Sequence, residues 1–315
     1  MKVFITREIP ETAVNLLSKK KYDIKVYRGN KPIPYHLLKK EVNDADAVIS
    51  LLTDKFDEEM IDAMPRCRII ANYAVGFNNI NVSYAKKKGI IVTNTPDVLT
   101  DSTADLTMTL ALACSRRLNE GVDMMKKRKF KGWQPKLLLG IELKGKNFGI
   151  IGAGRIGTAV GKRAIGFGVN ILYYDSRINT ELEAMGAKKV QLNFLLKKSD
   201  IISVHLPLTG STHQFLNKER LRLIKEGAIF INTARGEVVD EKELIKMLKE
   251  GKLFSAGFDV YNNEPDINPE LYELNNAILL PHLGSGTVDA RNAMAKLAAE
   301  NVISVLSGKT KITPV

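Results

Sequence analysis

The chain has 315 residues, of which 44% are hydrophobic and 26% are charged, and it carries a formal net charge of +12. At about 150 residues per domain, this length predicts two domains, with enough apolar residues for a sizeable core. Intrinsic disorder, a coiled coil and a disulfide-stabilised miniprotein are therefore poor descriptions of it.

The two cysteines, Cys67 and Cys114, are too few for a disulfide framework or a cysteine-based metal site, and no metal is predicted. We expect both thiols to be buried and unreactive, although Arg66 and Arg68 would favour the thiolate of Cys67. The apolar run at the N-terminus is too short for a signal peptide, and no apolar stretch is long enough for a membrane span. These features predict a cytoplasmic protein.

The positive charge does not by itself predict nucleic-acid binding. Lysines are scattered through helical patterns, and the two densest basic runs, 86–88 and 126–129, contain no interleaved aromatic residues. A solvated surface that attracts small anions is the better interpretation, so neither a nucleic-acid partner nor a membrane is expected.

Short apolar, β-branched runs alternate with longer amphipathic stretches, which is typical of βαβ units around a parallel sheet. The first series of expected strands is Lys2–Thr6, Ile24–Tyr27, Ala47–Leu52, Arg68–Tyr73 and Ile90–Asn94. A helical stretch from Ser102 to Arg128 and a loop precede a second series, which is Asn147–Ile151, Val169–Asp175, Asp200–His205, Ala228–Asn232, Phe254–Val260 and Ala277–Leu280. Six parallel strands are enough for one doubly wound dinucleotide-binding domain.

The expected fold class is therefore α/β, with two doubly wound parallel-sheet domains. A Rossmann NAD-binding domain, residues 99–286, would be inserted into a flavodoxin-like substrate domain, residues 1–98 and 287–315, to which the final helical pattern Val288–Leu306 would return. Residues 46–53 and 69–76 are similar in sequence to residues 200–209 and 229–236. Either both domains share one winding, or two Val/Ile-rich strand patterns coincide by chance.

A glycine motif, Gly152-Ala-Gly154-Arg-Ile-Gly157, follows the expected strand Asn147–Ile151 and opens a helical stretch. In this context the first glycine permits a tight turn, the second lets the backbone approach a pyrophosphate, and the third lets the helix pack on the sheet. The helix N-terminus would add N–H groups and a partial positive charge for the phosphates. The motif therefore predicts a dinucleotide cofactor.

The next expected strand ends at Asp175, 18 residues beyond Gly157, where a carboxylate accepts hydrogen bonds from the adenosine ribose. Such a carboxylate repels a 2′-phosphate, so NAD(H) is the preferred cofactor. Arg177 could bind that phosphate, which leaves NADP(H) open.

Hydride transfer with a nicotinamide needs a proton carrier, and a cation for any carboxylate on the substrate. Two of the four histidines, His205 and His282, lie at the carboxyl ends of expected strands, where doubly wound sheets bind ligands. Arg235 and Glu264 follow two further strands. Glu264 beside His282 would favour the imidazolium, and Arg235 would hold a carboxylate at two points.

At these residues the chain resembles, over its full length, the D-isomer-specific 2-hydroxyacid dehydrogenases. The resemblance is carried by Asn232-Thr-Ala-Arg-Gly236, Asp259-Val-Tyr-Asn-Asn-Glu-Pro265, Pro281-His-Leu-Gly-Ser285 and His205-Leu-Pro-Leu-Thr209. It implies that His282 is the acid/base, that Glu264 supports His282, that Arg235 binds the substrate, and that His205 contacts NAD. The expected cofactor contacts are Thr103, Gly152, Gly154, Arg155, Ile156, Gly157, Asp175, His205, Leu206, Pro207, Thr233, Asp259 and Ser285.

Other segments resemble the glyoxylate/hydroxypyruvate reductase branch of that family, among them Leu51-Leu-Thr-Asp54, Ala71-Asn-Tyr-Ala-Val-Gly76 and Gly132-Trp-Gln-Pro-Lys136. This resemblance implies that the Val75 and Gly76 backbone and Leu52 bind the substrate. It also implies that Trp133 lines the substrate site of a partner subunit in a homodimer, with ordinary loop packing as the alternative for this tryptophan. Asn78 stands where the family usually has Asp, which we expect to affect hydrogen bonding in the loop and not the chemistry.

The expected activity is NAD(P)H-dependent reduction of a small anionic 2-oxo acid, glyoxylate or hydroxypyruvate, to the D-2-hydroxy acid. Alternatives in the same class are a short D-3-phosphoglycerate dehydrogenase and a D-lactate-type dehydrogenase. An alternative from a different class is a corepressor-like protein that uses the NAD fold as a binding module.

Overall fold

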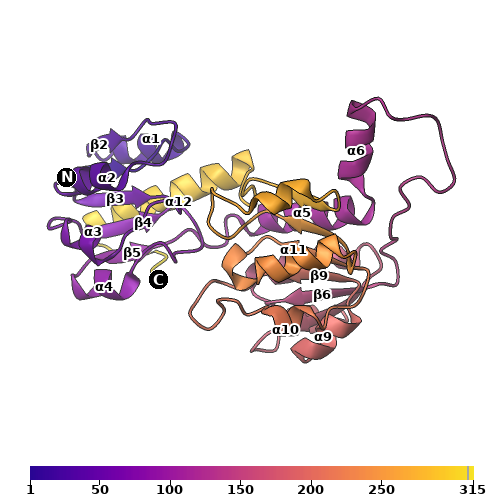
Figure 1. Ribbon diagram of the computed structural model, residues 1–315. Helices are drawn as coiled ribbons and strands as arrows, with labels where there is room; N and C mark the ends of the chain where they lie inside the picture. The colour runs from indigo at the N-terminus through magenta and orange to yellow at the C-terminus, as the bar shows by residue number, and fades with distance from the viewer. Residues whose placement is uncertain (311) are drawn as a thin grey trace. The chain divides into compact units, whose positions relative to one another are not determined.

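The computed structural model describes residues 1–310 and 312–315 (Figure 1). The chain divides into two compact units. Unit 1 comprises Met1–Leu99 and Gly286–Val315, and unit 2 comprises Thr100–Ser285. Each junction lies one residue from the expected domain boundary.

Unit 1 is built on a five-stranded parallel sheet with the strand order β2-β1-β3-β4-β5. Its strands are β1 (Lys2–Ile5), β2 (Asp23–Val26), β3 (Ala47–Ser50), β4 (Ile69–Asn72) and β5 (Ile91–Thr93). Its helices are α1 (Thr12–Ser18), α2 (Tyr35–Val42), α3 (Glu58–Asp62), α4 (Val82–Lys87) and α12 (Val288–Leu306). Every residue of β3 and β4 is buried, as expected for parallel strands covered on both faces.

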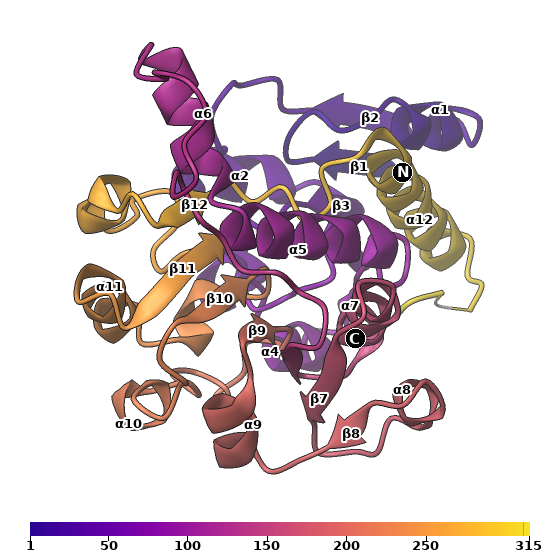
Figure 2. The same ribbon diagram turned by 90° about the vertical axis from the view of Figure 1, so that its right-hand side faces the viewer.

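The two faces of the unit 1 sheet are covered by different helices. Side chains of α2, α3 and α4 pack with Phe4, Val48 and Ile70 on one face. Helices α1 and α12 pack against each other, and α12 also lies against β3 and β4 (Figure 2). The alternation of side chains along a strand explains why such a sheet needs both layers.

Unit 2 is built on a seven-stranded parallel sheet with the order β12-β11-β10-β9-β6-β7-β8. Its strands are β6 (Asn147–Ile151), β7 (Asn170–Tyr174), β8 (Lys188–Lys189), β9 (Ile201–Val204), β10 (Ala228–Asn232), β11 (Leu253–Phe258) and β12 (Ala277–Leu279). Its α-helices are α5 (Thr100–Ser115), α6 (Leu118–Lys126), α7 (Arg155–Ile165), α8 (Thr180–Ala184), α9 (Leu192–Lys198), α10 (Lys218–Leu221) and α11 (Glu241–Lys249). Two short 3-10 helices are η1 (Gly236–Val238) and η2 (Pro269–Glu273).

Two hydrophobic clusters hold the layers of unit 2 together. Side chains of α5 and α7 form one cluster with Phe148, Ile150 and Ile229. Side chains of α9, α10 and α11 form the other with Ile202 and Phe230, on the opposite face of the sheet. The prediction of two doubly wound parallel-sheet domains is confirmed.

The segments that are similar in sequence, 46–53 with 200–209 and 69–76 with 229–236, occupy equivalent places in the two sheets. β3 and β9 each pair with the first strand of their unit, and β4 and β10 each lie one strand further out. The first and second strands of each unit are also neighbours. The two units therefore share this part of their winding.

Two local expectations were wrong. The stretch from Ser102 to Arg128 is not one helix, because Arg117, which has φ +53°, breaks it into α5 and α6. A left-handed backbone at a non-glycine residue cannot continue an α-helix. The short strand β8 was not expected either, and it consists of two exposed lysines at the edge of the sheet.

Both cysteines are buried and free. Burial raises the pKa of the Cys67 and Cys114 thiols to about 12. The neighbouring arginines do not favour a Cys67 thiolate, because Arg66 pairs with Asp46 and Arg68 donates hydrogen bonds to main-chain carbonyls of α12. No helix in the described part of the chain combines the length and the apolar character needed to cross a membrane.

Candidate functional site

The glycine motif lies in the turn between β6 and α7. Gly152 has φ +94°, and a Cβ atom there would lie 2.8 Å from the main-chain carbonyl of His205. A Cβ atom at Gly157 would lie 2.1 Å from the carbonyl oxygen of Gly152. Both positions therefore require glycine, the first for its backbone conformation and the second for the close approach of the helix to the turn.

The start of α7 is open to a ligand. A Cβ atom at Gly154 would have no neighbour within 4 Å. The N–H groups of Ile156 and Gly157 donate to no acceptor within residues 1–310 and 312–315. Free N–H groups at the N-terminus of an eleven-residue helix bind phosphate groups, so these residues fit a dinucleotide pyrophosphate.

A pocket of about 550 Å³ borders this turn and is lined by Ala153, Gly154 and residues 175–181. Asp175, at the end of β7, accepts hydrogen bonds from the N–H of Ala153 at 2.8 Å and from the N–H of Arg177 at 3.0 Å. The carboxylate is thereby fixed beside the glycine turn, while the side chain of Arg177 is exposed. The pocket fits the adenosine end of a dinucleotide.

Asn179 lines the same pocket, and it was not among the residues predicted to bind the cofactor. Its amide Nδ2 donates to the carbonyl oxygen of Ala153 at 2.8 Å and to Oγ1 of Thr158 at 2.7 Å, and its Oδ1 accepts from the N–H of Leu182. One side chain therefore ties the glycine turn to the start of α8. Its position four residues after Asp175 was the only available signal.

His205 lies just after β9, beside the glycine turn. Its Nε2 lies 2.7 Å from Oγ of Ser203. Burial lowers the pKa of His205 to about 3, so the ring is neutral at physiological pH. A neutral imidazole at this place can contact a cofactor but supplies no proton.

Glu264 and His282 form a direct pair. Oε2 of Glu264 lies 2.8 Å from Nδ1 of His282, and Oε1 accepts from the N–H of Tyr261 at 2.9 Å. Both side chains are partly buried, at 30% and 26% exposed. His282 has φ +56°, and its Nε2 makes no hydrogen bond within the described residues. The pair therefore presents one free ring nitrogen.

The electrostatics of this pair keep the Glu264 carboxyl group ionised. Burial raises the pKa of Glu264, but the hydrogen bond and the charge of His282, the N–H of Tyr261 and the charge of Arg235 outweigh it, so the net pKa is lowered. A carboxylate that stays ionised beside Nδ1 fixes the orientation of the ring.

Arg235 follows β10, and the loop that carries it is held by Asn232. The Asn232 side chain donates from Nδ2 to the carbonyl oxygen of Arg235 at 2.9 Å and accepts from the N–H of Ala234 at 3.0 Å. Burial lowers the pKa of the guanidinium, while the charges of Glu264 and Glu237 raise it. The structure therefore places a largely desolvated cation close enough to the Glu264–His282 pair to interact electrostatically with it.

Asp259 lies at the end of β11 and is only 1% exposed. Its two carboxylate oxygens accept from the N–H groups of Leu283 and Gly284 at 2.6 and 2.7 Å. The carbonyl oxygen of Gly284 accepts from the hydroxyls of Ser102 and Thr103 at 2.8 and 3.1 Å. Asp259 therefore fixes the backbone directly after His282. Burial raises the pKa of Asp259, and the two N–H groups and His282 partly offset this effect.

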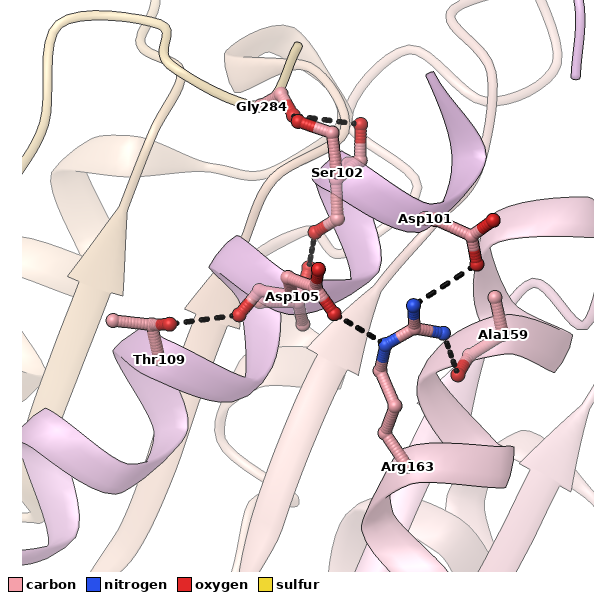
Figure 3. A network of polar contacts seen from close by, with 9 residues as sticks. Asp101, Ser102, Asp105, Thr109, Ala159, Arg163 and Gly284 are labelled. Atoms are coloured by element: carbon pink, nitrogen blue, oxygen red, sulfur yellow. Dashed lines mark hydrogen bonds and ion pairs between the residues drawn. The ribbon is translucent and has the colours of Figure 1, made fainter. Parts of the chain in front are cut away.

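A further polar network fixes the start of α5 (Figure 3). Arg163 of α7 donates to Asp101 at 2.9 Å and to Asp105 at 2.5 Å. Within α5, the hydroxyl of Thr107 lies 2.9 Å from that of Thr233, after β10. The predicted contacts Thr103, Thr233, Asp259 and Ser285 thus lie in connected segments of unit 2.

The predicted substrate residues of unit 1 lie at one edge of its sheet. Leu52 is in the loop after β3, and Val75 and Gly76 are in the loop after β4, where both are half-buried. In unit 2, Trp133 is 84% exposed and lies in the loop after α6. In the described ranges, no group of three or more His, Cys, Asp or Glu side chains could hold a metal ion.

Comparisons with known proteins identify the family. Residues 108–284 match the family model "D-isomer specific 2-hydroxyacid dehydrogenase, NAD binding domain". The chain is 48% identical to a glyoxylate reductase of Thermococcus kodakarensis over 317 residues, covering 99% of this chain and 95% of the relative. It superposes on the TT0316 protein of Thermus thermophilus with a TM-score of 0.94 and 41% identity, over 100% of both chains.

A D-lactate dehydrogenase of Aquifex aeolicus, solved with NAD and lactic acid, has a TM-score of 0.88 and 31% identity, covering 98% of this chain and 96% of that chain. The glycine turn and the pocket beside it agree with these matches, because both fit a dinucleotide. The chain belongs to the D-isomer-specific 2-hydroxyacid dehydrogenases, a family of NAD(P)-dependent enzymes, in the glyoxylate reductase branch.

Proposed function

We propose that this protein reduces a small 2-oxo acid, glyoxylate or hydroxypyruvate, to the corresponding D-2-hydroxy acid with NADH. The observation that carries the proposal is the Glu264–His282 pair, with 2.8 Å between Oε2 and Nδ1 and a free Nε2. The 48% identity to a glyoxylate reductase over nearly the whole chain supports this choice of substrate.

In the proposed mechanism, NADH held at the glycine turn and Asp175 would supply a hydride for the carbonyl carbon of the substrate. His282 donates the proton from Nε2 to the carbonyl oxygen and becomes a neutral imidazole. Glu264 holds the ring and stabilises its charged form before the transfer. Arg235 binds the substrate carboxylate and polarises the carbonyl group, as a guanidinium can do at two points.

The other predicted residues have binding roles in this proposal. The N–H groups of Val75 and Gly76 bind the substrate carboxylate together with Arg235, and Leu52 also contacts the substrate. The cofactor is held by the glycine turn, by Asp175 at the ribose, and by Thr103, Arg155, Ile156, His205, Leu206, Pro207, Thr233, Asp259 and Ser285. Because Asp175 repels a 2′-phosphate, NADH is the preferred cofactor, and the exposed Arg177 permits weaker use of NADPH.

The direction of the reaction depends on pH in this mechanism. Reduction needs the imidazolium form of His282 and oxidation needs the neutral imidazole. The pH optimum for reduction therefore lies below that for oxidation of the 2-hydroxy acid. Identical profiles in the two directions would contradict the role of His282.

Replacement of Glu264 by Gln is expected to move the pH profile of reduction. Because the lowered pKa of Glu264 keeps it ionised at neutral pH, the substitution removes a negative charge 2.8 Å from Nδ1 of His282. Without that negative charge the proton on the ring is held less strongly, and the fall in kcat/KM with rising pH should begin at a lower pH. The measurement is the pH dependence of glyoxylate reduction, with the exposed Glu226→Gln as the control. An unshifted profile would show that Glu264 does not act on His282.

The test of the proposed function is a panel of steady-state rates. NADH and NADPH oxidation are measured with glyoxylate, hydroxypyruvate, pyruvate and 3-phosphohydroxypyruvate. The highest kcat/KM is expected with NADH and glyoxylate or hydroxypyruvate. A preference for 3-phosphohydroxypyruvate would indicate a phosphoglycerate dehydrogenase, and a preference for pyruvate would indicate a lactate dehydrogenase. The absence of turnover with all four substrates would indicate a binding module.

We also propose that the chain acts as a homodimer and that Trp133 contributes to the site of the partner subunit. Helix α6 has no buried residue, and with the loop after it extends away from the sheet of unit 2 (Figure 1). This arm carries exposed apolar side chains, which are Leu118, Val122, Met125, Phe130, Trp133 and Leu139. An apolar surface of this kind is typical of a protein interface. A cytoplasmic location, in keeping with the two free thiols, is part of the same proposal.

The wild-type protein is accordingly expected to sediment at twice the mass of one chain. Replacement of Met125, which is 61% exposed, by Asp places a charge in the proposed interface and should shift the protein toward monomer. Analytical ultracentrifugation measures the distribution. The control Phe194→Asp changes an exposed apolar residue of α9 and should leave the dimer intact. A monomeric wild-type protein at micromolar concentration would refute the interface.

A further inference from the structure

The loop after β4 in unit 1 has its carbonyl groups fixed. The carbonyl oxygen of Ala74 accepts from the N–H of Thr95 at 2.9 Å. The carbonyl oxygens of Val75 and Gly76 accept from side-chain amides, Nδ2 of Asn94 at 2.9 Å and Nδ2 of Asn72 at 2.8 Å. Three successive carbonyl groups are thus held by neighbouring segments.

The N–H groups of the same loop are free. Those of Val75 and Gly76 donate to no acceptor among the residues that the structure describes. In a planar trans peptide, the C=O and the following N–H point in opposite directions. The bond from Thr95 to Ala74 therefore sets the direction of the Val75 N–H, and the bond from Asn94 to Val75 sets that of the Gly76 N–H.

We propose that Asn94 is a positioning residue, whose side-chain amide aims the N–H of Gly76 at the carboxylate of the substrate. The proposal rests on the proposed function, in which the Val75–Gly76 backbone binds that carboxylate. Two adjacent N–H groups with fixed directions form an anion site that adds to the charge of Arg235. Asn94 sets half of that site although it makes no contact with the substrate.

The main chain of Asn94 is held independently of its side chain. Its N–H donates to the carbonyl oxygen of Thr313 at 3.2 Å, and its carbonyl oxygen accepts from Oγ1 of Thr313 at 2.6 Å. Residue 94 is half-buried at the end of β5. Truncation of the side chain should therefore release the Val75 peptide and leave the fold of the segment in place.

The test is the steady-state kinetics of Asn94→Ala. The KM for glyoxylate is expected to rise about tenfold, because one hydrogen bond to a charged group is weakened, while kcat and the KM for NADH stay unchanged. Asn94→Asp, which replaces the donor by a carboxylate facing the Val75 carbonyl, should raise the KM further. The thermal unfolding midpoint of each variant shows whether the fold is intact.

The control is Asn43→Ala. The side chain of Asn43 also donates from Nδ2 to a main-chain carbonyl of unit 1, that of Ala63 at 3.3 Å. It lies between α2 and β3, away from the loop after β4, and its removal should leave every kinetic constant unchanged.

An unchanged KM for glyoxylate in both Asn94 variants would overturn the proposal. So would a rise in the KM for NADH equal to that for glyoxylate, because a general loss of structure would affect both ligands. Failure of the proposed function gives a different result, since the wild-type protein would then not reduce glyoxylate or hydroxypyruvate at all.

Discussion

Replacement of His282 by Ala is expected to lower kcat for glyoxylate reduction by about 10²–10⁴-fold, the usual contribution of a general acid. The variant lacks the imidazole that donates the proton in the proposed mechanism, so the carbonyl oxygen of the substrate must take its proton from water. The KM for NADH should change little, because the glycine turn and the Asp175 pocket are made by other segments of unit 2. Stopped-flow measurement of the single-turnover rate reports the chemical step directly.

Two further variants make this result specific. His282 has a left-handed backbone, φ +56°, which Asn tolerates better than Ala, so His282→Asn removes the acid with less strain and should show the same loss. His213 of unit 2 provides the matched control, and His213→Ala should behave as wild type. Near-wild-type turnover in both His282 variants would assign the proton transfer to another residue.

Replacement of Arg235 by Lys should lower kcat/KM for glyoxylate by about 10–10²-fold. Lysine keeps the charge but not the planar pair of donors, and each hydrogen bond to a charged group contributes about 1.5–3 kcal/mol. The loss should appear in both kcat and KM if Arg235 also polarises the carbonyl group. Steady-state kinetics with glyoxylate and hydroxypyruvate measure it.

The control for this substitution is Arg222→Lys, since Arg222 of unit 2 pairs with Glu243 and neither residue belongs to the candidate site. It should leave kcat/KM within about a factor of two, because the Arg222–Glu243 pair has no part in substrate binding or proton transfer. A large rise in the KM for NADH in Arg235→Lys, with the kinetics of glyoxylate unchanged, would place Arg235 at the cofactor and not at the substrate.

Most of the fold could be predicted because parallel strands buried on both faces appear in the sequence as continuous apolar runs. The limits of β6 and β10 and of α12 agree with the expected ranges. Strand β8 could not be predicted, because its two exposed lysines form no hydrophobic pattern. The break between α5 and α6 could not be predicted either, because no glycine or proline at position 117 signals the left-handed conformation of Arg117.

The candidate site divides in the same way. His282, Glu264 and Arg235 could be singled out as candidates because each is a polar residue that follows an apolar strand, and the carboxyl ends of parallel strands meet at one edge. Asn94 and Asn179 act on main-chain carbonyl groups, and which carbonyl an amide reaches depends on how the loops fold. Single-sequence reasoning therefore finds the chemistry of the site more readily than the side chains that hold it in shape.

The hydrogen bonds around Gly284 also bear on how the chain is threaded. Ser102 and Thr103 lie near the beginning of unit 2 and Gly284 lies at its end, and their contacts hold the entry and the exit of this segment side by side. Unit 2, of 186 residues, interrupts the chain of unit 1, and once folded it holds its own two ends close together. Its length therefore adds little to the loop-closure entropy that is lost when unit 1 folds.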